Sequence, residues 1–245
     1  MTGDGQSVRR KRDLAAVAVA MVLPTAITWL YFFGAAGMPE GVQRSIFAVV
    51  KVVQFALPAV WVAAVQRERL GTGRFAPAGV WAGLAFGVVV AAAIVALYAW
   101  VLRGSSLLAA ALPEMQSKVD GFGISTAWQF AALGAGYSLV HSLLEEYYWR
   151  WFVFGQLQRW TSVGWAVAIS SLGFMAHHVL VLGKYFGFGN PATYALSACV
   201  AVGGAVWAAM YRRTGSLLGP WLSHMLVDAA IFGVGYALLA ESLGG

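Results

Sequence analysis

The feature that most constrains this chain is a series of apolar segments about as long as a membrane is thick. A spanning helix needs ~20 mostly apolar residues. Seven segments of the sequence approach that length, at 14–36, 45–65, 78–102, 125 to beyond 150, 163–182, 191–211 and 217–240. The sequence therefore predicts an all-α, polytopic transmembrane helix bundle of about seven spans.

Charged residues are too few for an ordinary soluble domain. They make up 11% of the chain, against about 25% in soluble proteins. The net charge of +6 would suit a nucleic-acid-binding protein, but the basic residues cluster at the ends of the apolar segments rather than on one face. The composition favours the lipid bilayer as a partner and disfavours nucleic acid.

The basic residues also indicate an orientation, since cytoplasmic loops are enriched in Lys and Arg. With the N-terminus inside, the inner connections hold Arg9, Arg10, Lys11, Arg12, Arg67, Arg69, Arg74, Arg150, Arg159, Arg212 and Arg213, and the outer ones Arg44, Arg103, Lys118 and Lys184. We therefore expect a multi-pass protein of a bacterial cytoplasmic membrane with its N-terminus in the cytoplasm. Lys51, near the outer end of the second segment, is expected to extend its amine to the headgroups.

Three regions are expected along the chain. Residues 1–13 form a basic cytoplasmic tail, 14–124 hold three spans and a long outer loop, and 125–245 form a transmembrane core. The first apolar segment is longer than the core of a signal peptide and lacks a small-residue cleavage site, so we expect it to remain as an uncleaved span. The outer loop, at 104–123, is long enough for a short interfacial helix.

Ionisable side chains are concentrated in the apolar segments of the second half. Charged groups in hydrocarbon cost several kcal/mol, so those present usually face the bundle interior and have a function. The group consists of His141, Glu145, Glu146, Arg150, His177, His178, His224 and Asp228. The alternative is a polar network that only orders helix packing.

Spacings of four residues place several of these groups on shared helix faces. Glu146 can pair with Arg150, and His224 with Asp228. Adjacent helical residues diverge by about 100°. We therefore expect only one of Glu145 and Glu146 to face a given site.

A hairpin between the fourth and fifth segments should bring two of these groups to equal depth. Its turn is expected near Ser162, with Glu145 17 residues before it and His178 16 residues after it. His224 follows the last inner loop by about ten residues, or roughly 15 Å of helix. Three helices are therefore expected to converge on one polar site in the inner half of the membrane.

Such a site suits the attack of water on a peptide carbonyl. A carboxylate and a neutral imidazole can hold and deprotonate a water, and a second imidazole with an oxygen group can bind the oxyanion that develops. Two histidines and a carboxylate are also a common zinc set. A divalent metal at Glu145, His178, His224 and Asp228 therefore stays open, although the H-E-x-x-H signature is absent.

Three motifs in this region resemble those of a known family. E-E-x-x-x-R occurs at 145–150, F-x-x-x-H at 174–178 and H-x-x-x-N/D at 224–228. From about residue 128 to 240 the chain resembles the CPBP (CAAX protease and bacteriocin-processing) intramembrane endopeptidases. The resemblance implies that 125–245 is a catalytic core that cleaves a membrane-associated protein or peptide.

The resemblance also implies a role for each motif residue. Glu145 would be the general base, and His178 would hold the attacked water with it. His224 and Asp228 would form the oxyanion site; Asp228 stands where the family often has Asn, which makes a metal ligand easier to imagine. The supporting residues would be Glu146, Arg150, Phe174 and His141. His177 is expected to face away from the site.

Two other functions and several substrates are compatible with these residues. A proton- or ion-coupled transporter would use the same buried groups, but the chain shows no inverted repeat or paired broken helices. A non-catalytic scaffold would be expected to lack a motif residue, and none is missing. The substrates implied are prenylated C-terminal tails, leader peptides and C-terminal sorting anchors. The aromatic segment at 145–152 favours a membrane-anchored tail.

Overall fold

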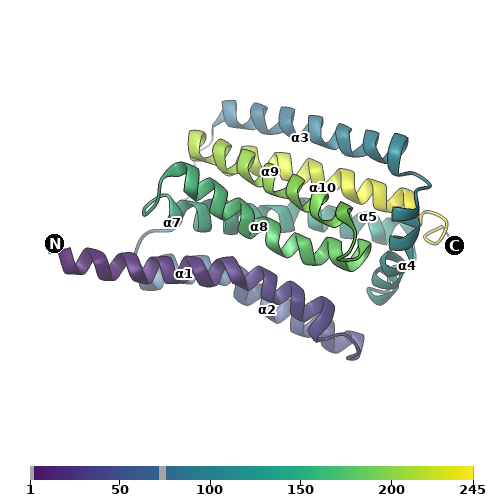
Figure 1. Ribbon diagram of the computed structural model, residues 1–245, viewed down its shortest axis with the longest axis horizontal. Coiled ribbons are helices and arrows are strands. Elements are labelled where there is room, and N and C mark those ends of the chain that lie inside the picture. Colours follow the sequence, from purple (N-terminus) through teal and green to yellow (C-terminus); the bar gives the residue numbers. More distant parts are fainter. Residues whose placement is uncertain (1–2, 72–75, 245) are drawn as a thin grey trace.

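The computed structural model describes residues 3–71 and 76–244, and in these ranges the chain is helical with no β-strand. Most helices run along one common direction, and a shorter one crosses the end of the bundle where the C-terminus lies (Figure 1). The prediction of an all-α polytopic bundle is confirmed.

The first half of the chain contributes four helices. α1 (Gly3–Trp29) continues into a π-helical turn, η1 (Leu30–Gly34), and α2 (Glu40–Val60) ends likewise in η2 (Trp61–Val65). α3 (Pro77–Leu97) is followed by η3 (Tyr98–Leu102), and α4 (Ser106–Gly121) is the helix that crosses the end of the bundle (Figure 1). α4 therefore forms within the loop for which an interfacial helix was expected.

The second half contains one composite helix and three regular ones. The composite helix runs without interruption through α5 (Ala127–Gly136), η4 (Tyr137–His141), α6 (Ser142–Glu146), η5 (Tyr147–Phe154) and α7 (Gly155–Leu157). It is followed by α8 (Val163–Phe186), α9 (Pro191–Thr214) and α10 (Leu218–Leu239). The serine hydroxyl at the expected hairpin turn, Ser162, accepts a hydrogen bond from the Trp165 amide and so caps α8.

In the part of the chain that the structure describes, six helices are long and apolar enough to cross a membrane. They are Gly5–Gly34, Gly41–Val65, Pro77–Leu102, Val163–Phe186, Pro191–Thr214 and Leu218–Leu239. The predicted fourth span, which coincides with the composite helix and carries three charged residues, falls outside this set, so a seventh span stays a prediction. The orientation also stays a prediction, and Arg74, one of its basic residues, lies outside the described residues.

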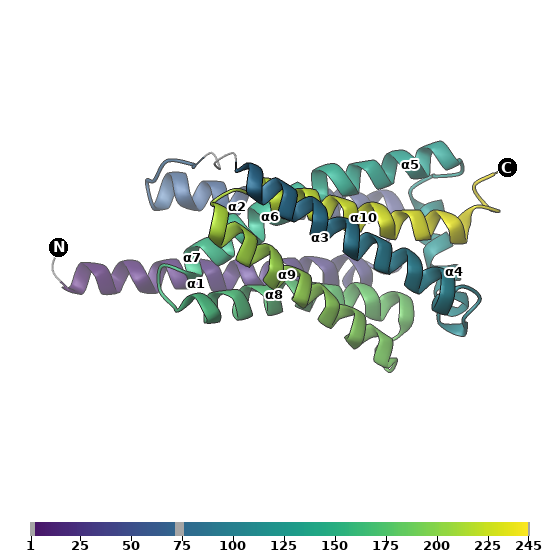
Figure 2. The same cartoon turned by 90° about the horizontal axis from the view of Figure 1, so that it is seen from above.

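One feature of the N-terminal half differs from the expectations. Residues 3–13 are the first turns of α1 rather than a separate tail. α3 packs closely against α10 on the face away from α1 and α2 (Figures 1 and 2). A Cβ on Gly83 would lie only 2.1 Å from the Gly219 carbonyl oxygen, so this helix crossing requires glycine.

A core of aromatic side chains holds the composite helix in place. Tyr148, Trp149 and Phe152 of η5 are fully or almost fully buried. Trp149 packs edge-on against Phe174 of α8, which packs in the same way against Trp207 of α9. The ionisable residues of α6 and η5 are therefore fixed inside a rigid apolar layer.

Candidate active site

Glu145 lies at the centre of the polar cluster, between the two π-helical segments of the composite helix. Its Oε1 is 3.4 Å from His141 Nε2 and 3.4 Å from His177 Nε2. Its Oε2 is 3.7 Å from His224 Nε2. One carboxylate thus faces three imidazoles, from the composite helix, α8 and α10. π-helical segments within an α-helix are frequent at functional sites.

Glu146 joins the first and third motifs. Its Oε1 is 3.0 Å from Arg150 Nη1 and 2.8 Å from His224 Nδ1, and its side chain is fully buried. Both glutamates therefore reach the same imidazole. The reason is that His224 presents its two ring nitrogens on different edges, and each receives one of the long side chains.

Arg150 is buried in an aromatic pocket. Its guanidinium carbon is 4.6 Å from the ring centre of Phe174 and 4.9 Å from that of Trp207, which allows cation–π attraction to both. Gly204 makes room for it, because a Cβ there would be 3.2 Å from Arg150 Nη2. Phe174, the first residue of the second motif, thus contacts the arginine of the first.

His178 has a defined arrangement of its ring nitrogens. Nδ1 is 3.0 Å from the Phe174 carbonyl oxygen, which can only accept, so Nδ1 carries the hydrogen and the neutral ring has its lone pair on Nε2. The ligand atoms of Glu145, His177 and His178 all lie within 4.8 Å of one another. Glu145 and His178 are therefore neighbours, as the equal-depth argument predicts.

His177 is the residue that the sequence reasoning missed. It was expected to face away from His178, yet its Nε2 is 3.4 Å from Glu145 Oε1 and its ring stacks on Trp149. The 100° rotation between adjacent helical residues describes only the direction in which a side chain leaves the backbone. The longer imidazole side chain of His177 can still bend towards Glu145. The one signal in the sequence that could have included His177 in the site is that it is adjacent to the motif residue His178.

Asp228 completes the cluster from the α10 side. Its Oδ1 is 3.6 Å from His224 Nε2, one helical turn away, and its side chain is 18% exposed. The His224 ring also stacks on the Trp207 ring, and the Trp207 indole N–H donates a hydrogen bond to the Ser223 hydroxyl. The His224 ring is therefore held by a rigid aromatic neighbour.

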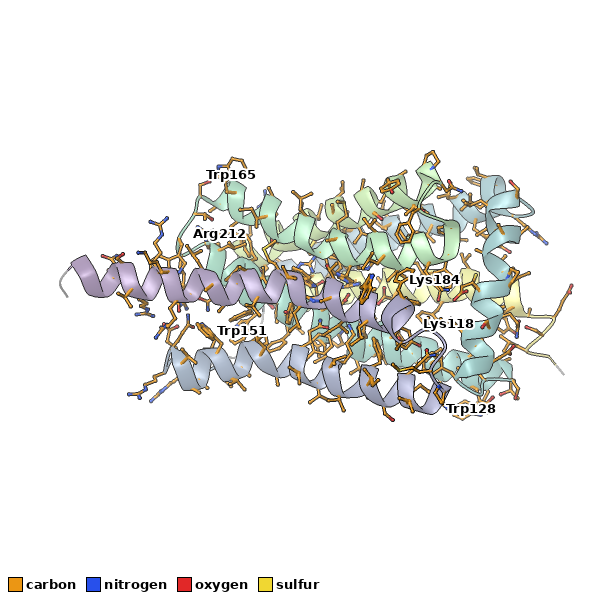
Figure 3. The ribbon with its side chains drawn as sticks, turned by 60° about the horizontal axis from the view of Figure 1, so that its bottom comes forward. Lys118, Trp128, Trp151, Trp165, Lys184 and Arg212 are labelled. Atoms are coloured by element: carbon orange, nitrogen blue, oxygen red, sulfur yellow. The ribbon has the colours of Figure 1, made fainter. Side chains whose placement is uncertain are left out.

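The cluster opens into a cavity of about 460 Å³. Glu145 contributes to its wall, whereas Glu146 and Arg150 do not. The other acidic and basic side chains in this wall are those of Lys51, Lys118, His141, His177, His178, His224 and Asp228. Lys118 belongs to α4, and it lies with Lys184 near the end of the bundle that α4 crosses, opposite Trp165 and Arg212 (Figure 3).

The donor atoms present fit a divalent metal such as zinc. Among the described residues, Glu145, His177 and His178 are the set close enough to share an ion. This differs from the expected set, in which His224 and Asp228 took part. Two imidazoles and one carboxylate leave a fourth coordination position for water.

Comparison with known proteins gives a match in the second half of the chain. Residues 127–230 match a family model described as Type II CAAX prenyl endopeptidase Rce1-like. No curated protein and no solved structure matches the chain. The matched segment contains all three motifs and every ionisable residue of the cluster.

Proposed function

The chain belongs to the CPBP family through its residues 127–230, and on this premise we propose that it cleaves a membrane-anchored protein or peptide with a water activated by Glu145 and His178. The family domain supports intramembrane endopeptidase activity in general. The observation that carries the specific proposal is that Glu145, His178, His224 and Asp228 share one cavity wall.

The first step is the attack of water on the scissile carbonyl. His178 Nε2 accepts a hydrogen bond from the water and orients it, because Nδ1 is already bonded to the Phe174 carbonyl. Glu145 accepts the water proton as the hydroxide attacks the carbonyl carbon, and then passes that proton to the leaving amine. Positioned acid–base catalysis of this kind typically contributes ~10²–10⁴-fold.

The second element is a donor for the oxyanion. His224 donates from Nδ1 to Glu146, 2.8 Å away. With a proton also on Nε2, the same ring donates to the carbonyl oxygen as it becomes negative. Carboxylates of Glu145 and Asp228, 3.7 and 3.6 Å from Nε2, stabilise this doubly protonated ring.

A metal-assisted version of the reaction would use the same wall. Glu145, His177 and His178 would hold the ion. A bound divalent metal supplies a Lewis acid and a more acidic water. Activity retained after all bound metal has been removed would exclude this version, and its loss and recovery on adding zinc back would support it.

The apolar anchor of the substrate has a place beside the site. A groove of about 710 Å³ lies between α2 and the composite helix. Its wall is apolar except for Lys51, Tyr137 and His141. Such a groove suits a prenyl chain or an apolar anchor helix better than a soluble leader peptide, so a membrane-anchored tail is the favoured substrate.

The test is cleavage by the purified, reconstituted protein. A farnesylated C-terminal peptide, a leader peptide and a peptide with a C-terminal anchor helix would be compared by mass spectrometry. We expect cleavage of an anchored peptide by the wild-type protein and its loss in Glu145→Ala and His178→Ala. Unchanged cleavage by both variants would refute the proposal. Uptake of a solute into proteoliposomes that depends on Glu145, without cleavage, would favour a transporter.

A further inference from the structure

Lys51, which the sequence led us to expect at the headgroups, lines two spaces next to the candidate active site. It lies within the candidate span Gly41–Val65, well away from either end. Its Nζ is 5.5 Å from the ring centre of Phe47 and 5.4 Å from that of Phe55, the aromatic residues one turn before and after it. The two spaces that Lys51 lines are the catalytic cavity and the apolar groove. Its amine is therefore at the junction of the two spaces.

Arg150, a cation that is fully enclosed in the bundle, has a different environment. It has a carboxylate oxygen of Glu146 at 3.0 Å. Among the side chains that the structure describes, no carboxylate oxygen lies within 4.0 Å of Lys51 Nζ. Aromatic rings attract an ammonium group, but they do not satisfy its three N–H donors. A charge in hydrocarbon without a close counter-ion is a candidate binding group.

The site is within reach of this amine. The Phe55 ring that contacts Lys51 also packs edge-on against His141, with ring centres 6.0 Å apart. His141 Nε2 is 3.4 Å from Glu145 Oε1. One aromatic ring thus separates the lysine from the residue that holds the proposed base. A group bound at Lys51 would be close to the scissile bond.

From these contacts we infer that Lys51 binds the free C-terminal carboxylate of the substrate. The inference rests on the proposed function and adds to it the residue that would recognise the C-terminus of the substrate. A carboxylate that leaves water for this cavity must be paired with a cation, and the ammonium of Lys51 can supply charge-assisted hydrogen bonds. A cavity of about 460 Å³ is in the size range of small-molecule sites, which fits a short released peptide.

The experiment compares two peptides that differ only at the C-terminus. Both carry a farnesylated cysteine near the end; one ends in a free carboxylate and the other in an amide. We expect the wild-type protein to cleave the acid with a kcat/KM about 10- to 100-fold higher than the amide, the range of a hydrogen bond to a charged group. In Lys51→Met the ratio of acid to amide should fall to about one.

Lys184→Met is the matched control. Lys184 pairs with Glu114 at 3.2 Å and does not line the catalytic cavity. This variant loses the same charge as Lys51→Met, but at a position outside the cavity. It should therefore keep the wild-type ratio of acid to amide cleavage. Melting temperature and detergent-solubilised size would be measured for each variant, which separates loss of the fold from loss of recognition.

Binding to the Glu145→Gln protein gives a readout that does not depend on turnover. A fluorescent acid peptide should bind more tightly than the amide, and adding Lys51→Met should abolish the difference. Equal cleavage of acid and amide by the wild-type protein, or an equal fall for both in Lys51→Met, would overturn the inference about Lys51 alone. Preferential binding of the acid without cleavage of either peptide would contradict the proposed function and support carboxylate binding by Lys51.

Discussion

The molecule contains two arginine–glutamate clusters of similar composition in opposite surroundings. In the buried cluster, Glu146 pairs with Arg150, whose side chain is only 2% exposed. In the peripheral cluster, which consists of Glu68, Arg9 and Arg159, both arginine side chains are 40% exposed. The same chemical pair therefore has different consequences, because water can replace a lost partner in one place and not in the other.

The two clusters also connect different parts of the chain. Glu68 receives two hydrogen bonds from Arg159, at 3.1 and 2.8 Å, and another from Arg9, so it joins α1, the segment after η2 and the turn before α8. Glu146 joins the composite helix to α10 through His224. The first cluster ties the ends of helices together, and the second orients an imidazole that lines the cavity.

The largest effect is expected for Glu145→Gln. This change keeps the size of the side chain and removes the proposed base, so kcat should fall by ~10²–10⁴-fold. The melting temperature should change little, since the glutamine oxygen can still accept hydrogen bonds from the imidazoles of His141 and His177. Cleavage rate and thermal unfolding of the same preparation would be compared. A variant that cleaves at the wild-type rate would assign the base elsewhere.

Glu146→Gln is expected to act mainly on stability. It leaves Arg150 buried without its counter-ion, and the loss of one partner of a buried ion pair costs ~3–5 kcal/mol. The midpoint of denaturant unfolding should shift accordingly, while the folded fraction retains measurable cleavage. If both glutamine variants lost the same activity at the same stability, the division into a base and a supporting residue would be wrong.

A smaller effect is expected from Gly204→Ala, which changes no charge. The added methyl would press on Arg150 Nη2 at 3.2 Å and on Phe174 Cδ1 at 3.3 Å. Overpacking of this kind typically costs ~1–3 kcal/mol. Gly203→Ala is the matched control, because the nearest atom, on Trp207, is 3.6 Å away. Equal unfolding midpoints for the two variants would show that the arginine pocket tolerates the methyl.

The smallest effect is expected at the exposed cluster. The hydrogen bond from Arg159 is the main reason why the pKa of Glu68 is below its usual value. A lowered folded-state pKa means that the pairing stabilises the protein above the unfolded pKa and is lost as the pH falls through the folded value. Glu68→Gln should therefore cost only ~0–1 kcal/mol at neutral pH, and nothing below pH ~3. The melting temperatures of the wild-type protein and Glu68→Gln would be measured from neutral pH down to pH ~3. A difference that stays constant with pH would show that the Glu68 carboxylate is not stabilised by Arg159.

The sequence predicted the helices better than it predicted the contacts of the site. The starts of α8, α9 and α10 follow from apolar length and, for α8, from the turn near Ser162, because these signals are local. The pairing of Glu146 with Arg150 is also local, since it depends only on helical spacing. The depth match of Glu145 and His178 required one further assumption, an antiparallel hairpin.

Contacts between distant segments escaped the sequence argument. The Glu146–His224 hydrogen bond joins residues 78 positions apart, and no spacing rule applies to it. His177 was assigned to the wrong face because the angle between neighbours says nothing about the reach of a ring. Lys51 was assigned to the headgroups because its distance along the helix was known and the direction of its side chain was not.

The amino-acid sequence by itself determined the all-α membrane architecture and the three motifs, since apolar length and four-residue spacing act within single helices. Only the tertiary structure decided which imidazole each glutamate contacts, that His177 joins the cluster, and that Lys51 faces the cavity. These depend on the rotation of one helix against another, which is set by close packing such as that of Gly83 on Gly219 and of Arg150 on Gly204. Packing of this kind is a property of pairs of surfaces and cannot be assigned to either segment alone.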